Sequence, residues 1–285
     1  MSDLPPPVPK LNARQLLDDV NRSTGAALRF VEQAAGGEVG AAYVRWPDGR
    51  DAVLTRGAGG LSELRRTAEA LGAARGHGLP VPEYQLLAEL ADGVGVVQER
   101  LPGRAPAQVD QKLLEAMIAL AERFAGIAPD LPVPSMYLLE SGPGFCLHES
   151  LERYDARTRR VLGWVHEVGR SEPGAMTGDD LVHLDFHTGN ILVDGTGTVT
   201  GIVDWDGIGR GDRYFGLVTL RFDAHVRLPD ADLTWFDELL DNLLEPAVLR
   251  LYWAHMALRM VDWSIRHHTP ADTTLWLDFV AHRMT

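Results

Sequence analysis

Hydrophobic and polar positions in the first third of the chain form short apolar runs separated by turn residues, a pattern that predicts an antiparallel sheet. The runs are Ala27–Gln33, Ala41–Trp46, Asp51–Arg56, Glu83–Leu90 and Gly95–Glu99. Pro47-Asp48-Gly49 separates the second run from the third and is a strong hairpin signal. Apolar residues at helical spacing predict one helix before the sheet and one after its third strand, at Leu11–Thr24 and Leu61–Arg75.

Beyond Leu101 the pattern changes to longer stretches with helical periodicity. Helices are predicted at Gln108–Ile127, Glu149–Val168, Leu233–Leu244, Ala247–Trp263 and Leu275–His282. A second hairpin interrupts them, with apolar runs at Ile191–Val193 and Val199–Val203. Because Pro102-Gly103 breaks the pattern, we expect two lobes, residues 1–100 and residues 101–285.

Composition narrows the class of protein. The 285 residues are 45% hydrophobic, enough for a large buried core. A formal net charge of −13 argues against a nucleic-acid partner, since that binding depends on Lys and Arg that neutralise phosphates. Because no long apolar run and no signal peptide are found, we expect no membrane association. One cysteine, Cys146, fits a reducing compartment, and we expect the cytoplasm. Lysine is rare, since Lys10 and Lys112 are the only two among 27 basic residues.

The most informative segment is His183-Leu184-Asp185-Phe186-His187-Thr188-Gly189-Asn190, followed after the second hairpin by Asp204-Trp205-Asp206. Phosphoryl transfer from ATP needs a carboxylate that accepts the proton of the acceptor hydroxyl, and oxygen ligands that hold Mg²⁺ against the phosphates. A His-x-Asp turn with Asn five residues after the Asp is typical of a kinase catalytic loop. The adjacent strands of the hairpin would let Asn190 and Asp204 converge on one ion.

Each of these residues has a simpler interpretation when taken alone, because a lone Asp is usually a cap or a turn residue. The multi-part pattern favours the kinase interpretation. We expect His183 to brace the loop, whereas His187 is open between loop support and a contact in the catalytic site.

These residues resemble the aminoglycoside phosphotransferase family, which is related to choline kinases and more distantly to protein kinases. The resemblance extends over roughly residues 25–258, and its specific part is His183–Leu217. It implies an α+β, two-lobed protein-kinase-like fold, with an antiparallel sheet plus helix in a nucleotide-binding lobe (1–100) and a mainly helical catalytic and acceptor lobe (101–285). It also implies ATP and Mg²⁺ as cofactors, Asp185 as the catalytic base, and Asn190 and Asp204 as metal ligands. Asp206 belongs to the family's Asp-x-Asp/Glu element.

The sequence departs from the family pattern at two places in this segment. Leu184 replaces the usual Gly between the His and the Asp, a change that other kinases tolerate. The later family motif Gly-Asp-Pro-x-x-Asp-Leu is Gly211-Asp212-Arg213-Tyr214-Phe215-Gly216-Leu217 here. Asp212 is retained, but Gly216 replaces the second Asp and removes one expected brace of the loop.

The nucleotide side of the pattern has its own candidates. Gly37, within Gly36-Gly37-Glu38-Val39-Gly40, would lie in a loop over the phosphates, although a glycine cluster between strands is also an ordinary hairpin turn. The third strand should carry a cation for the phosphates, and without a lysine we expect Arg56, with Arg45 second. The expected carboxylate partner falls near Thr67, which leaves Glu63 or Glu69. By resemblance, the carbonyl of Glu99 and the amide of Leu101 would contact the adenine edge.

The acceptor is suggested by a row of carboxylates. Asp237, Asp241 and Glu245 recur every four residues, and like charges at this spacing destabilise a helix unless a cation relieves them. In the family the C-terminal helices line the acceptor cleft, which favours a polycationic acceptor. We expect it to contact Asp206, Asp237, Asp241, Asp262 and Trp205.

With the family resemblance, this pattern leads us to expect a cationic antibiotic as the acceptor. An aminoglycoside is the typical acceptor of the family, and a cyclic peptide of the viomycin and capreomycin type is the competitor. A metabolic kinase for choline or a sugar is the enzymatic alternative. A nucleotide-binding pseudokinase is the alternative from another class, since the phosphate-binding lysine is missing. The choice between ATP and GTP and the oligomeric state stay open.

Overall fold

The computed structural model describes residues 10–34, 39–127, 138–142, 146–171 and 176–284. Its contacts divide the chain into two compact units. The first, which we call the sheet unit, comprises Val8–Pro134 and Asp179–Arg213. The second, the helical unit, comprises the described residues of Ser135–Gly178 and Tyr214–Thr285. The catalytic segment predicted from sequence therefore groups with the N-terminal sheet, and a lobe boundary at residue 100 stays a prediction.

The sheet unit is built on five antiparallel strands in the order β1-β2-β3-β5-β4. Their bounds are Arg29–Gln33 (β1), Ala42–Arg45 (β2), Asp51–Gly57 (β3), Tyr84–Leu90 (β4) and Gly93–Glu99 (β5). The predicted hairpin closes with Trp46 N donating to Arg50 O at 2.9 Å, and Gly49 takes the positive φ of 92° that this turn requires.

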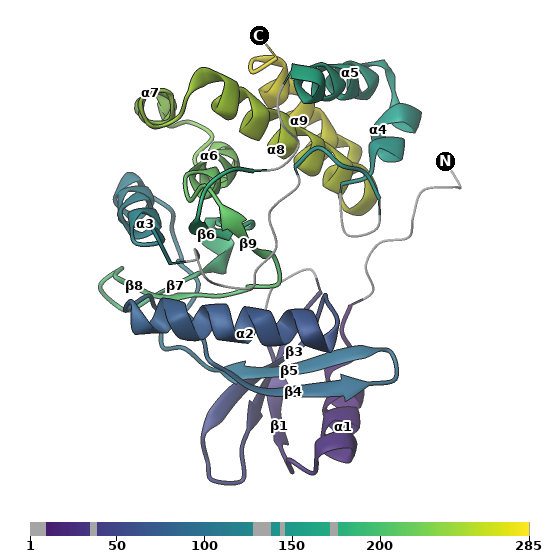
Figure 1. Cartoon of the computed structure of the whole chain (residues 1–285), viewed down its shortest axis with the longest axis vertical. Helices are drawn as coiled ribbons and strands as arrows, with labels where there is room; N and C mark the ends of the chain where they lie inside the picture. The colour runs from purple at the N-terminus through teal and green to yellow at the C-terminus, as the bar shows by residue number, and fades with distance from the viewer. Residues whose placement is uncertain (1–9, 35–38, 128–137, 143–145, 172–175, 285) are drawn as a thin grey trace. The chain divides into compact units, whose positions relative to one another are not determined.

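Helices α1 (Ala13–Thr24) and α2 (Leu61–Gly76) cover opposite faces of this sheet (Figure 1). On the α1 face, Leu16 and Val20 pack with alternate residues of the strands: Ala42, Val44, Ala52, Leu54 and Val97. On the α2 face, Leu64 packs with Val94 and Val96, and Tyr84 and Leu87 pack against this cluster. Since side chains alternate along a strand, these two clusters fix which face every other strand residue occupies.

Two small sheets, a 3₁₀ turn and helix α3 complete the sheet unit. β6 (Asp180–His183) pairs with β9 (Ile208–Gly211), and β7 (Ile191–Val193) pairs with β8 (Val199–Ile202). A 3₁₀ turn, η1 (Thr188–Asn190), leads into β7. Helix α3 (Gln111–Glu122) begins at Asp110, whose carboxylate accepts from Leu113 N at 2.8 Å.

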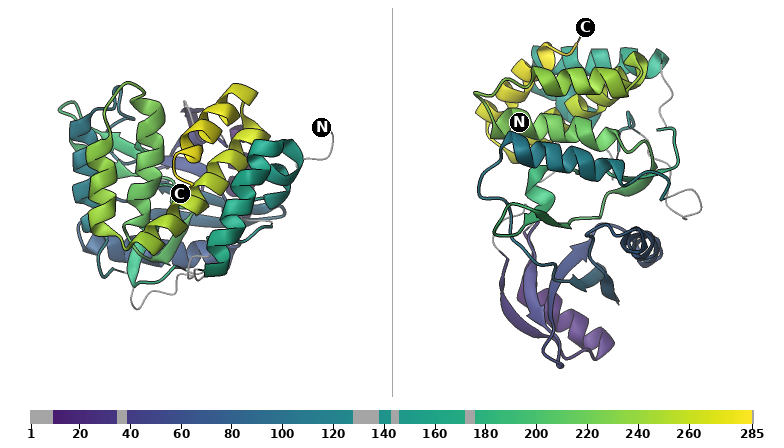
Figure 2. Two further views of the ribbon diagram at one scale, coloured as in Figure 1. Left: turned by 90° about the horizontal axis from the view of Figure 1, so that it is seen from above. Right: turned by 90° about the vertical axis from the view of Figure 1, so that its left-hand side faces the viewer.

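The helical unit contains six helices within its described residues: α4 (His148–Tyr154), α5 (Ala156–Ser171), α6 (Phe215–Arg227), α7 (Thr234–Leu243), α8 (Pro246–His267) and α9 (Pro270–Ala281). Helix α8 is central, because α4, α5, α6, α7 and α9 all pack against it (Figure 2). Its residues from Leu251 to Leu258 are all buried, which explains why the sequence shows little amphipathic pattern there.

The secondary structure differs from the sequence predictions in three places. The single helix predicted at Glu149–Val168 is two helices, because Asp155 is extended and its carboxylate accepts from Arg157 N and Thr158 N at 2.7 and 2.8 Å. Helix α6 was missed, since nine of its residues are buried and the period of 3.6 is hidden. The four-residue strands β6 and β9 were also missed.

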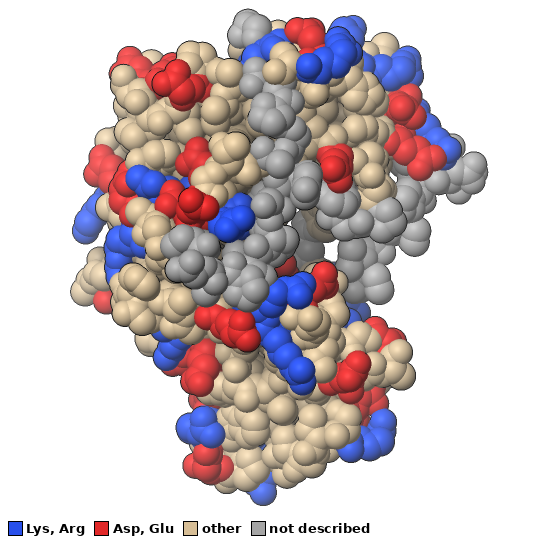
Figure 3. All heavy atoms as spheres, viewed as in Figure 1, with Lys and Arg blue, Asp and Glu red and all other residues tan. Residues whose placement is uncertain are grey.

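The antiparallel sheet and the packed helices together confirm the predicted α+β fold class. In the described part of the chain, no helix combines the length and apolarity needed to cross a membrane. Acidic and basic side chains are interspersed on the face seen in Figure 3. Exposed ion pairs occur in the sheet unit, for example Arg45 with Asp51 at 2.7 Å.

Candidate active site

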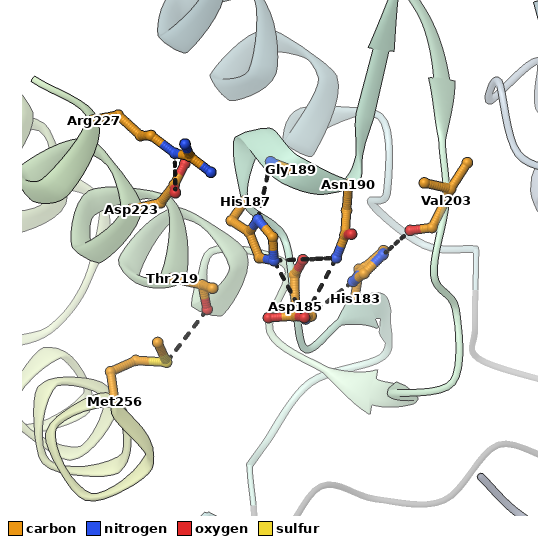
Figure 4. A network of polar contacts seen from close by, with 10 residues as sticks. All are labelled: His183, Asp185, His187, Gly189, Asn190, Val203, Thr219, Asp223, Arg227 and Met256. Atoms are coloured by element: carbon orange, nitrogen blue, oxygen red, sulfur yellow. Dashed lines mark hydrogen bonds and ion pairs between the residues drawn. The ribbon is translucent and has the colours of Figure 1, made fainter. Parts of the chain in front are cut away.

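His183 joins the catalytic loop to the second hairpin (Figure 4). Its Nδ1 accepts from the amide of Asp185 at 3.0 Å, so the proton of the neutral ring is on Nε2, which donates to the carbonyl of Val203 at 3.0 Å. The side chain is buried, and its ring lies 4.4 Å from the ring of Trp205. These contacts are those of a brace, as the sequence led us to expect.

His187 orients the carboxylate of Asp185. The amide of Gly189 donates to His187 Nδ1 at 3.0 Å, which places the proton of a neutral ring on Nε2. Nε2 then donates to Asp185 Oδ2 at 3.3 Å. Figure 4 shows the imidazole and the carboxylate facing each other. A base held by a fixed donor is preorganised to accept a proton on its other oxygen.

Asn190 and Asp204 are brought together by the β7–β8 hairpin. Ile191 pairs with Ile202, and Val203 N donates to Asn190 O at 2.9 Å, so each residue stands just beyond the last pair of the hairpin. Asn190 Nδ2 donates to Asp185 O at 3.0 Å, which leaves Oδ1 as the oxygen that a metal ion would use. Asp204 has a φ of 64°, a strained conformation for a residue other than glycine, and such strain concentrates at functional sites.

Asp206 lies beside Asp204 in a crowded setting. Its Oδ2 accepts from Ala58 N, in the loop before α2, at 3.3 Å. Crowding by protein and, second, the negative charge of Asp204 raise the pKa of Asp206 to about 6, although its carboxylate keeps access to solvent. Burial and the same two carboxylates raise the pKa of Tyr84, so this β4 residue also stands next to the site.

This donor set fits Mg²⁺ that arrives with a nucleotide. Mg²⁺ is usually bound by one or two protein carboxylates together with substrate phosphates, and Asn190 Oδ1 and the Asp204 carboxylate are hard oxygen donors of that kind. No cluster of three His, Cys, Asp or Glu side chains among the described residues could hold a metal by itself. The phosphates would therefore complete the coordination.

Comparison with known proteins assigns this arrangement of residues to a family. A model of a family described as the phosphotransferase enzyme family matches residues 30–252, most of the chain. The chain belongs to this family. A search of curated protein sequences gave no significant match.

Solved structures share the fold of this phosphotransferase at low sequence identity. A thermostable mutant of aminoglycoside phosphotransferase APH(4)-Ia, in a ternary complex with ADP and hygromycin B, is 16% identical with a TM-score of 0.69, over 96% of this chain and 97% of the other. Amicoumacin kinase hAmiN, in complex with AMP-PNP, Ca²⁺ and Ami, is 14% identical with a TM-score of 0.64, over 96% and 93%. Wild-type aminoglycoside 2′-phosphotransferase-IIIa, in a GDP complex, is 15% identical with a TM-score of 0.59, over 96% and 99%.

The expectation that Arg56 reaches the phosphates needs correction. Arg56 pairs with Gly95, where an added Cβ would lie 2.5 Å from Val20 of α1, so Arg56 is on the α1 face. Its guanidinium contacts Asp92 Oδ1 at 3.0 Å in the turn between β4 and β5. On β3, Thr55 and Val53 share the α2 face with Gly57, and neither carries a positive charge.

The other sequence candidates near α2 have local roles in the structure. Glu63 caps its own helix by accepting from Gly60 N at 2.8 Å, and Glu69 is exposed. Thr67 is the buried helix residue at this position. Arg45 is held by Asp51 at 2.7 Å. Gly37 lies outside the described residues.

Of the two residues predicted to contact adenine, Glu99 is held by other residues, whereas the amide of Leu101 is open. The Glu99 carboxylate bonds Arg75 at 2.5 Å, and Glu99 N donates to Glu83 O at 2.8 Å. The amide of Leu101 makes no hydrogen bond within the described part of the chain. An open amide after a sheet strand is what a ligand with an acceptor edge would use, and adenine contact at Glu99 and Leu101 stays a prediction.

Three of the proposed acceptor residues are corrected by their surroundings. Trp205 is 1% exposed, and its Nε1 donates to Ile202 O at 2.9 Å, so the ring is a core residue. Asp262 is 1% exposed and is held by Arg266 at 2.7 Å and by Leu147 N at 3.1 Å. Asp237 is shared by Arg221 at 2.9 Å and Arg283 at 2.7 Å. The charges of Asp262 and Asp237 are already neutralised by arginine side chains.

Asp241 is exposed on α7, and Asp206 is accessible beside Asp204. These two carboxylates stay predicted acceptor contacts.

Sequence reasoning missed two contributors to the site. Tyr84 is an aromatic residue in a strand, which normally signals packing, and only the fold places it beside Asp204 and Asp206. Arg213 stands where the family motif has Pro and ties this segment to β6 and α3, through Asp180 at 2.7 Å and Glu122 at 3.1 Å. This pairing supplies a brace in a motif that lacks its second Asp.

Proposed function

We propose that this phosphotransferase transfers the terminal phosphoryl group of ATP, with Mg²⁺, to a hydroxyl group of a cationic antibiotic. The observation that carries the proposal is the placement of Asp185, Asn190 and Asp204 around one end of the β7–β8 hairpin. These are the residue types that proton acceptance and Mg²⁺ coordination need.

The chemistry assigns one task to each group. The acceptor oxygen forms a bond to the γ-phosphorus as the bond to the ADP bridging oxygen breaks, and the hydroxyl proton passes to Asp185. His187 Nε2–H holds the Asp185 carboxylate in place during this step. Mg²⁺, bound by Asn190 and Asp204, would neutralise charge on the phosphates.

The proposal of a cationic antibiotic as the acceptor is supported by the net charge of the chain and by the ligands of similar solved structures. The chain has a net charge of −13, and a negative protein field concentrates polycations. Similar folds hold hygromycin B and amicoumacin together with nucleotides. An aminoglycoside is the first candidate acceptor, and a cyclic peptide of the viomycin and capreomycin type is the second.

One observation favours a nucleotide-binding module without turnover: the β3 arginine faces α1 instead of the site. The retention of Asp185, Asn190 and Asp204 argues against it, since a module that only binds nucleotide needs no proton acceptor. A metabolic kinase for choline or a sugar shares the same chemistry and differs only in the acceptor.

The deciding experiment measures ADP release with Mg²⁺ and ATP against a panel of aminoglycosides, viomycin, capreomycin, choline and neutral sugars. We expect one cationic antibiotic to gain a single phosphate by mass spectrometry and to be captured less well as salt rises, because screening weakens long-range attraction. Turnover with choline or a sugar alone would support the metabolic alternative. Nucleotide binding without any turnover would support the module.

A further inference from the structure

Four residues form a continuous row across the α2 face of the sheet. Tyr43 of β2 pairs with Val53 of β3, Val53 pairs with Gln98 of β5, and Gln98 pairs with Tyr84 of β4. Directly paired residues point to the same side of a sheet, and Tyr84 packs with the α2 cluster, so all four lie on the α2 face. The row is a shelf of two aromatic rings and one aliphatic side chain with a single amide between them.

The side-chain amide of Gln98 has no hydrogen-bond partner within the described part of the chain. Gln98 is 8% exposed, and its side chain makes no hydrogen bond among the described residues. A primary amide has two donors and an acceptor, and the N and O atoms of Gln98 are not among the described side-chain atoms that are fully buried without a partner. The Gln98 amide therefore keeps access to solvent, and its donors and acceptor are available to a bound molecule.

The surroundings of the row indicate what that molecule is. Gln98 is followed by Glu99 and Arg100 and then by the open amide of Leu101. The guanidinium of Arg100 lies over the Tyr43 ring at 3.8 Å and closes that end. At the other end, Tyr84 adjoins Asp204 and Asp206. A flat, largely apolar shelf with an amide and a backbone donor at its edge, and the predicted metal ligands beyond it, fits the purine base of a nucleotide.

We propose that the side-chain amide of Gln98 recognises the base of the bound nucleotide and selects adenine. Its Oε1 would accept a hydrogen bond from N6 of adenine, and its Nε2 would donate one to N7. The proposal rests on the proposed function in that the ligand is a nucleoside triphosphate.

Adenine matches the amide better than guanine does. On this edge adenine offers one donor, N6–H, and one acceptor, N7, and glutamine pairs with both. Guanine offers two acceptors, O6 and N7, so the amide would have to donate twice and leave Oε1 buried against O6. The chain should therefore prefer ATP to GTP, although similar folds hold either adenine or guanine nucleotides.

The test compares ATP, 7-deaza-ATP and GTP by isothermal titration of the full chain with Mg²⁺ and without acceptor. The analogue 7-deaza-ATP lacks only the N7 acceptor. For the unsubstituted protein we expect 7-deaza-ATP and GTP to bind about 10-fold more weakly than ATP, the scale of one lost base contact. In Gln98→Met, which keeps the length and removes the amide, we expect ATP and 7-deaza-ATP to bind equally.

Gln85→Met is the matched control, because Gln85 follows Tyr84 on β4 and its amide oxygen already accepts from Trp46 Nε1 at 2.8 Å. Its nucleotide affinities should equal those of the unsubstituted protein. Equal binding of ATP and 7-deaza-ATP by the unsubstituted protein would overturn the assignment without any variant, as would an unchanged N7 penalty in Gln98→Met. Binding of no nucleotide at all would instead refute the proposed function, and this assignment with it.

Discussion

The carboxylates of the catalytic segment and those of the C-terminal helices differ in whether an arginine side chain neutralises them. Asp206, in the sheet unit, has no arginine or lysine partner among the described residues, and crowding and Asp204 raise its pKa to about 6. Asp262, in the helical unit, is more deeply buried, but Arg266 bonds both of its oxygens at 2.9 and 2.7 Å. Asp237 is bonded by two arginines in the same way.

This difference separates functional charge from structural charge. A carboxylate that is left beside a like charge costs stability, and a site accepts that cost when a ligand supplies the cation. A carboxylate that is already paired with arginine has no charge left for a ligand, and the pair stabilises the fold instead. Substitutions in the first region should therefore change catalysis, whereas substitutions in the second should change stability.

The largest effect is expected for Asp185→Asn. Loss of the proton acceptor should lower turnover by about 10²- to 10⁴-fold while nucleotide affinity is kept. Steady-state kinetics with the best acceptor, together with titration of ATP, check this. Asp194→Asn, at the exposed tip of the β7–β8 hairpin, is the control and should keep full turnover. Unchanged turnover in Asp185→Asn would refute the assignment of the base.

Asp262→Asn should act on stability instead. It leaves the guanidinium of Arg266, whose side chain is 12% exposed, without its charge partner, and breaking a buried pair costs about 3–5 kcal/mol of unfolding free energy. Urea unfolding measures this. The control is Glu149→Gln, which breaks the exposed pair with Arg153 on α4 and should cost at most about 1 kcal/mol. A rise in the KM for the acceptor without a loss of stability would instead support the prediction that Asp262 contacts the acceptor.

His255 makes the helical unit sensitive to acid. Burial lowers the pKa of His255 to about 4, while its Nδ1 donates to Leu138 O and its Nε2 is buried without a partner. As pH falls from 6.5 toward 4 the unfolded chain takes up the proton first, so stability decreases in that window. Between pH 7 and pH 5 His255 should account for a loss of about 2 kcal/mol.

The measurement compares urea unfolding of the unsubstituted protein with that of His255→Gln, which keeps a donor for Leu138 O but does not titrate. The variant should lose less stability than the unsubstituted protein over this range. Identical losses would show that His255 does not carry the effect.

The smallest effect is expected for Asp206→Asn in the absence of ligand. Removal of a charge that crowding and Asp204 disfavour should raise stability, by about 1 kcal/mol once solvent screening at this accessible side chain is considered. Thermal unfolding without nucleotide or metal checks the sign. A decrease in stability would mean that the Asp206 charge is favourable in the fold, and the contrast with Asp262 would fail.

The sequence by itself determined the elements with a clear period and the residues with a fixed spacing. The five strands of the N-terminal sheet, the hairpin at Pro47-Asp48-Gly49 and the helix at Leu61 all follow from local patterns. Asp185, Asn190 and Asp204 were found because a loop and a hairpin bring them together over a short stretch of chain. Local geometry carries such information, since strand pairing across a tight turn leaves little freedom in register.

Tertiary structure alone decided which side chains face the site and which charges are already paired. The face of Arg56 depends on its register with β5, and the burial of Trp205 depends on His183 and on Phe124, which lies far away in sequence. The partners of Asp237 come from α6 and from the end of the chain. In the sequence Gln98 is an ordinary polar residue near the end of a strand, and only the strand register places it between Val53 and Tyr84 on the α2 face. Charge and periodicity along a chain do not specify such contacts, because they are made between segments whose separation in sequence carries no local signal.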